Sequence, residues 1–190
     1  MPVESLDPAH TALVLVDLQR GVVSRDVAPH PADTVLDNAL AMAEAFRAAG
    51  APVVLVRTTA AAGDRPLVDA AVPVRRASRA SEEVVEELRD LGDVLVTKQT
   101  WGAFHDTDLD EQLRSREVDT VVLAGIATNT GVESTARAAH EHGYSVVVAE
   151  DACSSLDAAM HEFAVARVFP LISRVTTSAR VVQALRSPPA

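Results

Sequence analysis

Two ionisable residues stand at the ends of apolar runs that have the composition of β-strands. Asp17 ends the run in LVLVDLQRG, and Lys98 ends the run in VLVTKQTWGAF. Apolar neighbours raise the pKa of a carboxyl group unless a cation or hydrogen bonds compensate. A lysine ammonium in the same surroundings must find water or an anion. Contact between the two would hold the Asp17 proton in a defined place, as general acid–base catalysis requires.

Both residues also have structural interpretations. Asp17 could cap a helix or close a loop, and Lys98 could reach solvent along its apolar stem. The loop after Lys98 favours a site, because it carries Trp101 and Phe104 in a chain with 3% aromatic residues. One of these aromatics is expected to close the core beneath the loop instead.

A third segment, LAGIATNTGVESTARAA, passes from a strand through small polar residues into a helix. Backbone N–H groups at a helix N-terminus form a cradle for an anion or oxyanion. Ala127, Thr128 and Asn129 would line it, and Arg57, at the end of an earlier strand, could bind an acidic group of the same ligand. Such loops occur in many α/β proteins, so the cradle alone does not define an activity.

The elements that must position these residues alternate along the chain. Apolar runs rich in β-branched residues predict strands at 12–18, 52–58, 94–98, 120–125, 145–149 and 174–177. Amphipathic segments between them predict helices at 33–49, 81–91, 107–117, 132–142, 157–169 and 178–186. This alternation predicts a parallel sheet covered by helices on both faces, with the site at the carboxyl ends of the strands.

The 190 residues suit one α/β domain spanning residues 1–190. Residues 60–80 have weak periodicity and predict a long loop that could form a lid or a site wall. The SPPA tail is expected to fray.

Composition excludes several classes of protein. The net charge of −10 argues against nucleic-acid binding. No apolar run is long enough for a membrane span, and the chain starts without a signal-peptide pattern, so we expect a cytoplasmic protein. Cys153 is the only cysteine, which excludes an intramolecular disulfide and a cysteine-rich zinc site. No GxGxxG follows the first strand, so dinucleotide binding is not expected.

The three segments together resemble the isochorismatase-like hydrolases, also called the cysteine hydrolase superfamily. The matching motifs are VDLQ with Asp17 and Gln19, KxxxGAF from Lys98 to Phe104, and GxxTNxxVxxTA from Gly125. The resemblance covers nearly the whole chain. It implies a three-layer α/β/α sandwich around a Rossmann-like, six-stranded parallel sheet, a small-molecule substrate, and assembly into a homodimer or homotetramer. We expect the substrate-binding residues to include Gln19, Trp101 and Phe104 from these motifs, together with Arg57 and the loop residues Ala127, Thr128 and Asn129.

One position departs from the family pattern. Most members use an Asp–Lys–Cys triad, and the residue-by-residue alignment places Gly131 where the cysteine would stand. Cys153 follows a different strand, so its expected role is a small buried residue. Thr130 and Ser134 carry hydroxyls nearby, but the sequence identifies no histidine base for either. A glycine here also occurs in the isochorismatase branch, in which the aspartate protonates an enol ether without covalent catalysis. The TN loop, in contrast, resembles the amidase-type members.

The resemblance leaves three hypotheses. The first is a hydrolase without a cysteine nucleophile, in which Asp17 is the general acid–base group and Lys98 assists it. The second is a catalytically silent member that binds a small metabolite or serves as an assembly subunit. The third, a thiol-dependent amidase using Cys153, conflicts with the alignment. The nicotinamidase-type metal motif after the second strand contains no histidine here, so no catalytic metal and no cofactor are expected.

Overall fold

The computed structural model describes residues 3–59, 68–69 and 78–186. Most of the predicted loop at 60–80 and the SPPA tail lie outside the described residues. The described strands form one six-stranded parallel sheet in the order β3-β2-β1-β4-β5-β6. Their bounds are β1 Thr11–Val16, β2 Val53–Thr58, β3 Val94–Lys98, β4 Thr120–Ile126, β5 Ser145–Ser154 and β6 Arg174–Thr176.

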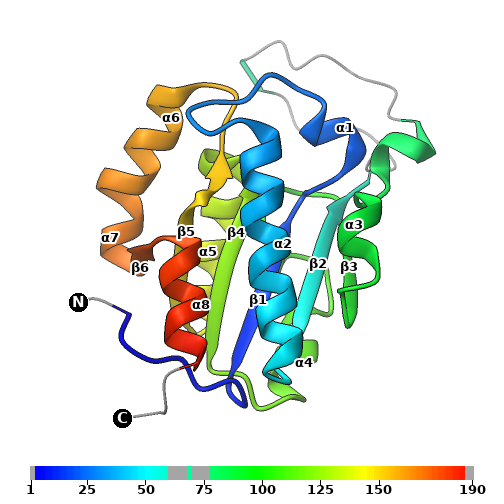
Figure 1. Cartoon of the computed structure of the whole chain (residues 1–190). Coiled ribbons are helices and arrows are strands. Elements are labelled where there is room, and N and C mark those ends of the chain that lie inside the picture. Colours follow the sequence, from blue (N-terminus) through cyan, green and yellow to red (C-terminus); the bar gives the residue numbers. More distant parts are fainter. Residues whose placement is uncertain (1–2, 60–67, 70–77, 187–190) are drawn as a thin grey trace.

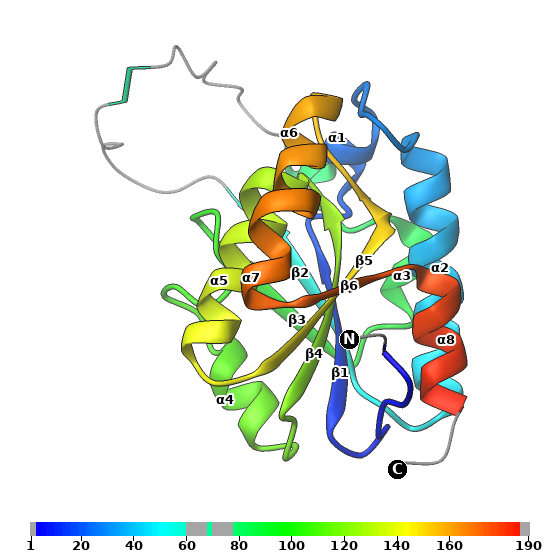
Figure 2. The same ribbon diagram turned by 90° about the vertical axis from the view of Figure 1, so that its left-hand side faces the viewer.

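Helices cover both faces of this sheet (Figures 1 and 2). On one face lie α2 (Ala32–Ala48), α3 (Glu86–Arg89) and α8 (Ser178–Arg186). On the other lie α4 (Leu109–Arg114), α5 (Glu133–Glu141) and α7 (Phe169–Ile172). The short α1 (Arg20–Val23) and α6 (Ala158–Phe163) stand near the carboxyl ends of the strands. The arrangement confirms the predicted three-layer α/β/α fold.

Apolar side chains explain why the layers pack together. Every residue of β1 is buried, and β4 is buried from its second residue onward. Met42 and Phe46 of α2 are fully buried against this sheet. Continuous apolar strands of this kind are stable only when both faces are covered, as the sequence pattern predicted.

One predicted helix is wrong in part, and another is helical as predicted but has an irregular middle. The segment 81–91 is broken because its middle pairs with the chain after β1: Val84 bridges Gln19, and the Val85 N–H donates to the Leu18 carbonyl. The segment 157–169 divides into α6, a wide π-type turn at Ala164–Val168, and α7. Pro170 near the start of α7 has no N–H to continue the regular ladder.

Two other elements differ in extent. A wide turn at Thr128–Val132 precedes α5, so the predicted helix at 132–142 begins with this turn. β5 runs to Ser154, beyond the predicted 149, because its pairing with β4 resumes after a register shift between Leu123 and Gly125. Such a bulge changes the direction in which the neighbouring side chains point.

The sheet order reverses between β1 and β4, which lie side by side in its centre. Gly125 allows this close approach: it has a φ of 137°, and a Cβ there would lie 2.0 Å from the Val16 carbonyl oxygen. In open α/β sheets, ligands bind outside the carboxyl ends of the strands at such a reversal. Among the described residues, no helix is long and apolar enough to cross a bilayer.

Candidate active site

The Asp17 and Lys98 side chains are in direct contact at the carboxyl edge of the sheet. Lys98 Nζ lies 2.7 Å from Asp17 Oδ2, which confirms the contact predicted from the strand-end positions. The Lys98 side chain is 1% exposed and the Asp17 side chain 11%. Lys98 is the only lysine among the 17 Lys and Arg residues of the chain. Its ammonium is a compact charge with three donors, whereas the guanidinium of arginine is a larger planar group.

Thr58, the last residue of β2, completes the network. Its hydroxyl donates to Asp17 Oδ1 at 2.8 Å and accepts from Lys98 Nζ at 2.6 Å. Lys98 also donates to the Thr100 carbonyl at 3.1 Å, so each of its three protons has an acceptor. Thr58 and Lys98 are register partners on adjacent strands, which places their side chains on the same face of the sheet. Sequence analysis missed Thr58, although strand parity relative to Lys98 could have found it.

Asp17 is held in an unusual conformation and an unusual environment. Its φ of 57° lies in the left-handed region, where aspartate is tolerated better than most residues. Its N–H donates to the Val56 carbonyl and its own carbonyl accepts from the Gln19 N–H, which fixes this turn. Burial raises the Asp17 pKa above the ordinary value of 3.8, and the attraction and hydrogen bonds of Lys98 and Thr58 oppose that rise.

Gly131 faces the same carboxylate. A Cβ added to Gly131 would lie 2.9 Å from Asp17 Oδ2 and 3.2 Å from Val16 Cγ1. A side chain at position 131 would therefore start against the Asp17 oxygen that Lys98 holds. The structure brings together the three residues predicted as the catalytic centre, Asp17, Lys98 and Gly131.

The remainder of the 126–131 loop is held from the other side. Ile126 and Ala127 are joined by a cis peptide bond. Thr128 is buried with its hydroxyl 2.8 Å from His161 Nδ1. Asn129 accepts a hydrogen bond from Ser155 Oγ through its side-chain oxygen. The N–H groups of residues 130 and 132 donate to the Ala127 carbonyl, so these two do not serve as cradle donors.

Two predicted substrate-binding residues have their polar groups engaged by the protein. Gln19 is 2% exposed and its amide binds backbone groups of Thr58 and Glu82. Arg57 donates to Thr97 Oγ1 and lies 3.9 Å from Glu83, whereas the next residue, Thr58, contacts Asp17. Successive strand residues point to opposite faces, so Arg57 lies on the face opposite to the one on which Thr58 meets Asp17.

The two aromatic residues of the loop after Lys98 lie in different surroundings. Trp101 is 66% exposed, and its backbone oxygen would lie 3.8 Å from a Cβ at Gly131, so this residue stays beside the site. The Phe104 ring stacks on His142 with centroids 5.0 Å apart and tilts against Tyr144 at 5.8 Å. Phe104 therefore packs against the core at the turn between α5 and β5, which is the role expected of one of the two aromatics.

Cys153 lies in the core, as expected. It is fully buried on β5, opposite Gly125 of β4. Burial raises the pKa of its thiol to about 12, so the reactive thiolate does not form at neutral pH. This environment argues against Cys153 as a nucleophile.

Two cavities lined by described residues lie away from Asp17. One, of about 380 Å³, lies beside Tyr144 and Arg174, and the other, of about 500 Å³, lies between Arg47 and Arg116. Both are near the amino-terminal ends of the strands, where parallel sheets seldom place a reaction centre. The buried acid–amine pair makes the opposite edge the candidate active site.

Comparison with known proteins decides the family. The model of the isochorismatase domain matches residues 11–180. The chain belongs to the isochorismatase family. It is 43% identical to the isochorismatase family protein YecD of Escherichia coli O157:H7, over 95% of this chain and 98% of that one.

A solved isochorismatase family structure from Burkholderia thailandensis superposes on the chain with a TM-score of 0.87. The two chains are 40% identical, and the match covers 97% of this chain and 99% of that one. The ureidoacrylate amidohydrolase RutB of Methylobacterium radiotolerans is 29% identical over 97% of this chain and 83% of its own length. The chain is thus also similar to a protein named for amide hydrolysis.

Proposed function

We propose that this protein is a hydrolase for a small-molecule substrate and works without a cysteine nucleophile. Asp17 is its general acid–base group, and Lys98 and Thr58 position the Asp17 carboxyl. The proposal is carried by two groups that meet at Asp17 Oδ2. Lys98 Nζ lies 2.7 Å from this oxygen, and a Cβ at Gly131, which the glycine lacks, would lie 2.9 Å from it. A reacting group that enters over Gly131 meets the proton-transferring oxygen directly.

The electrostatic environment fits this role. Burial raises the Asp17 pKa, which brings a carboxyl group closer to the range in which it exchanges protons near neutral pH. The ammonium of Lys98 keeps one oxygen fixed and stabilises the ionised form. A ligand-binding protein gains little from a buried acid–amine pair, so the pair favours an enzyme over the silent alternative.

Water is the proposed nucleophile. Position 131 has no side chain, and Cys153 is buried in the core with a raised pKa. Asp17 can then act in two ways. As an acid it protonates an enol ether or leaving group before water adds; as a base it takes a proton from the attacking water. The RutB relative makes an amide a second candidate for the bond that breaks.

Asp17 and the loop residues Trp101, Ala127 and Asn129 are proposed to surround the substrate. Trp101 offers an exposed side chain, and its backbone oxygen faces Gly131. Asn129 offers an amide nitrogen that donates to Met160 Sδ at 3.4 Å. Gln19 and Thr128 are proposed as positioning residues, since backbone groups and His161 engage their polar atoms.

The experiment is a kinetic comparison of Asp17→Asn with the wild-type chain on substrates from a screen of small amides and enol ethers. Loss of the transferable proton should lower kcat by about 10²- to 10⁴-fold with KM little changed. Asp37→Asn, which changes an exposed carboxylate of α2 in the same way, is the matched control. The Asp17→Asn substitution leaves the Lys98 ammonium without its anionic partner and could destabilise the fold. Thermal unfolding therefore verifies that the variant is folded.

The pH profile separates the two roles. If Asp17 acts as an acid, kcat falls as pH rises through its raised pKa; if it acts as a base, kcat rises. Because Lys98 is the only lysine, a chain labelled with ¹³C-lysine gives one side-chain signal set, whose shift reports Asp17 titration directly. Full turnover of a folded Asp17→Asn protein would exclude the acid–base role, and absence of any turnover by the wild type would favour the binding protein.

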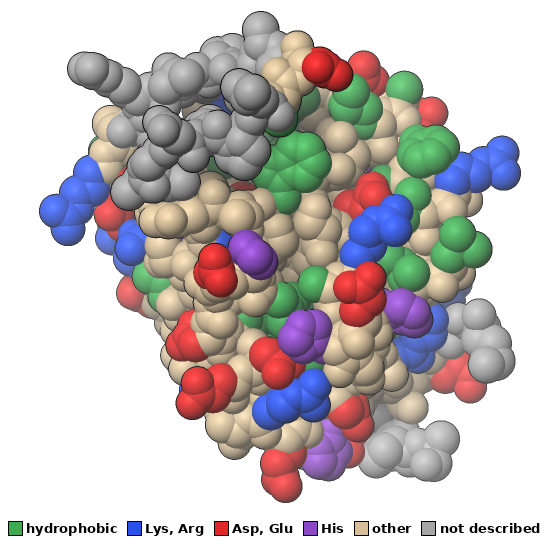
Figure 3. Space-filling view, turned by 180° about the vertical axis from the view of Figure 1, so that it is seen from behind, with side chains coloured by type: hydrophobic (Ala, Val, Ile, Leu, Met, Phe, Trp, Pro, Cys, Tyr) green, Lys and Arg blue, Asp and Glu red, His purple; other side chains and the backbone are tan. Residues whose placement is uncertain are grey.

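We also propose the homodimer or homotetramer that the family resemblance implies. Large apolar side chains are exposed on and around α6 and α7, and Figure 3 shows several hydrophobic side chains, with charged ones between them, on the side of the molecule where these helices lie. They include Leu156 (57% exposed), Phe163 (61%) and Leu171 (80%). An apolar group of this kind is typical of a subunit contact, and a second copy of the chain is its expected partner.

A further inference from the structure

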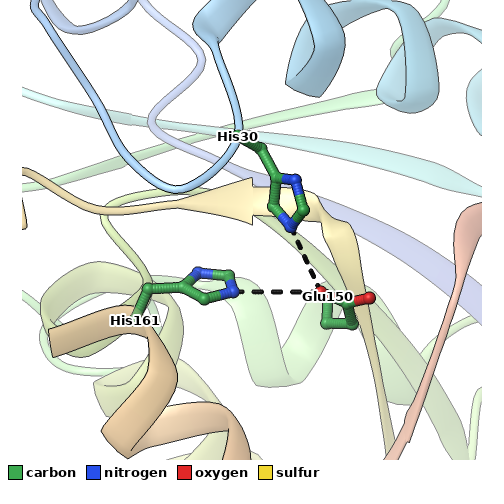
Figure 4. A group of neighbouring side chains, drawn as sticks. All are labelled: His30, Glu150 and His161. Atoms are coloured by element: carbon green, nitrogen blue, oxygen red, sulfur yellow. Dashed lines mark hydrogen bonds and ion pairs between the residues drawn. The ribbon is translucent and has the colours of Figure 1, made fainter. Parts of the chain in front are cut away.

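Three side chains from distant parts of the sequence meet beside the 126–131 loop. His30 comes from the loop before α2, Glu150 from β5 and His161 from α6 (Figure 4). His30 Nε2 lies 3.2 Å from Glu150 Oε2, and His161 Nε2 lies 3.8 Å from the same oxygen. One ligand atom of each residue lies within 4.8 Å of the other two.

We propose that His30, Glu150 and His161 form a binding site for a divalent transition-metal ion of the Zn²⁺ type. The site goes beyond the proposed hydrolysis and does not depend on it. Two imidazoles and one carboxylate are a ligand set that Zn²⁺ uses in proteins. Ligand atoms about 2.0–2.1 Å from a tetrahedral ion lie about 3.3–3.4 Å from one another. The separation of His30 Nε2 from Glu150 Oε2, 3.2 Å, is close to this value, and a small shift of the His161 ring would shorten the 3.8 Å separation.

The orientation of the rings supports the ion. Both histidines direct Nε2 toward one oxygen of Glu150, and the rings meet edge to face at 81° with centroids 5.4 Å apart. At 3.8 Å, His161 Nε2 is too far from Glu150 for a hydrogen bond. An ion between the three atoms would give this nitrogen a partner inside the protein, where the His161 side chain is only 4% exposed.

His161 also has the second partner that metal-bound histidines need. Its Nδ1 lies 2.8 Å from Thr128 Oγ1, so an Nδ1–H donated to this hydroxyl leaves the Nε2 lone pair free for metal. The His30 and Glu150 side chains are 29% and 30% exposed, which leaves one side of the cluster open for entry and for a water ligand.

The surrounding backbone is already assembled. Ala28 and Ser155 form an isolated antiparallel bridge with hydrogen bonds of 2.8 and 3.0 Å, which joins the His30 loop to the end of β5. A bound ion would link this pair of segments to α6. Through Thr128 it would also brace the loop that presents Gly131 to Asp17.

Zinc binding by the chain without an affinity tag tests the proposal. After chelator treatment and dialysis, titration calorimetry should show one Zn²⁺ bound per chain with a Kd in the micromolar range or below. Co²⁺ bound at the same site should give the visible absorption of a low-coordinate ion. His30→Gln, at a loop position whose side chain is 29% exposed, should weaken Zn²⁺ binding by about 10-fold or more without unfolding the protein.

His105→Gln is the matched control, because His105 also lies beside a carboxylate, Asp106 at 3.3 Å, but outside the cluster. It should bind Zn²⁺ like the wild type. Zn²⁺ should raise the Tm of the wild type and of His105→Gln, but not of His30→Gln. Equal Zn²⁺ affinity of His30→Gln and the wild type, or no binding by the wild type, would overturn the proposal. Neither result bears on hydrolysis, which the Asp17 variants test separately.

Discussion

The Asp17–Lys98 pair and the His30–Glu150–His161 cluster contact the same loop but satisfy their charges differently. In the pair, opposite charges meet at 2.7 Å, and all three Lys98 protons have acceptors. In the cluster, both histidines face one carboxylate oxygen of Glu150. His30 lies at hydrogen-bond distance from it, and His161 lies beyond that distance. The pair is complete without a ligand, whereas the cluster has the composition of a site that a cation would complete.

The difference follows from where the residues stand in the fold. Asp17, Thr58 and Lys98 end or follow three adjacent strands, so the sheet itself fixes their positions. Two members of the cluster come from a loop and a short helix beyond the sheet edge. A paired buried charge needs a rigid frame to offset desolvation, while a metal site can be assembled from segments that the ion itself links.

The largest expected effect comes from breaking the pair. Lys98→Met keeps the apolar stem but leaves the Asp17 carboxylate buried without a cation. Unfolding free energy should fall by about 3–5 kcal/mol where Asp17 is ionised, and turnover should fall by roughly 10²-fold. Urea unfolding and steady-state kinetics measure the two effects. Unchanged stability and turnover would show that the pair is not the centre of the site.

The same variant has a defined pH dependence. Burial already raises the folded-state pKa of Asp17 above its ordinary 3.8, and loss of Lys98 raises it further. Between the unfolded and folded pKa values the folded chain binds more protons, so stability falls as pH rises through that window. In Lys98→Met the upper limit of this window lies at a higher pH, so the unfolding free energy of the variant should keep falling at pH values where that of the wild type is already constant. The control is Lys98→Met combined with Asp17→Asn, in which this pH dependence should disappear.

These two regions also differ in how far the sequence predicts them. The strand-end positions of Asp17 and Lys98 predict their contact because parallel strands end at one edge of the sheet. The charge of Arg57 predicts a contact with an acidic ligand group, but the alternation of strand side chains directs the next residue, Thr58, to the Asp17 carboxylate. Phe104 could not be placed from its loop alone, since its position depends on packing against His142 and Tyr144 in the turn between α5 and β5.

The histidine cluster could not be predicted, although Glu150 stands near a strand end. His30 and His161 are 131 positions apart, and no spacing rule connects a loop histidine to a helix histidine. Their meeting depends on the Ala28–Ser155 bridge and on the bulge in β5, which are tertiary features. Local pattern likewise placed the helix at 81–91 but missed the strand-like pairing of Val84 and Val85.

An intermediate effect is expected where the pair meets the loop. In Gly131→Ala, the new Cβ would lie 2.9 Å from Asp17 Oδ2, an oxygen that Lys98 already holds. The carboxylate or the loop must shift, so we expect a loss of about 1–3 kcal/mol and a fall in kcat of roughly 10-fold. Gly102→Ala is the control, because its Cβ would make an ordinary 3.6 Å contact with Ser134.

Kinetics and thermal unfolding of both variants measure the difference. Equal behaviour of Gly131→Ala and Gly102→Ala would mean that the space over Asp17 is not used. The same contact predicts that Gly131→Cys does not simply restore a cysteine-dependent site, since its Cβ meets the carboxylate before the thiol can be placed.

The smallest effect on activity is expected at Cys153, which belongs to neither region. The thiol is fully buried opposite Gly125, and its pKa of about 12 keeps it protonated at neutral pH. Cys153→Ala should remove a small apolar contact, lower unfolding free energy by about 1 kcal/mol and shift Tm by about 2–4 °C. Turnover should match the wild type, and treatment of the folded wild-type chain with a thiol alkylator should leave it unchanged. A folded Cys153→Ala protein without activity would instead indicate that the thiol is the nucleophile. The proposal that the Asp17 site works without a cysteine would then be wrong.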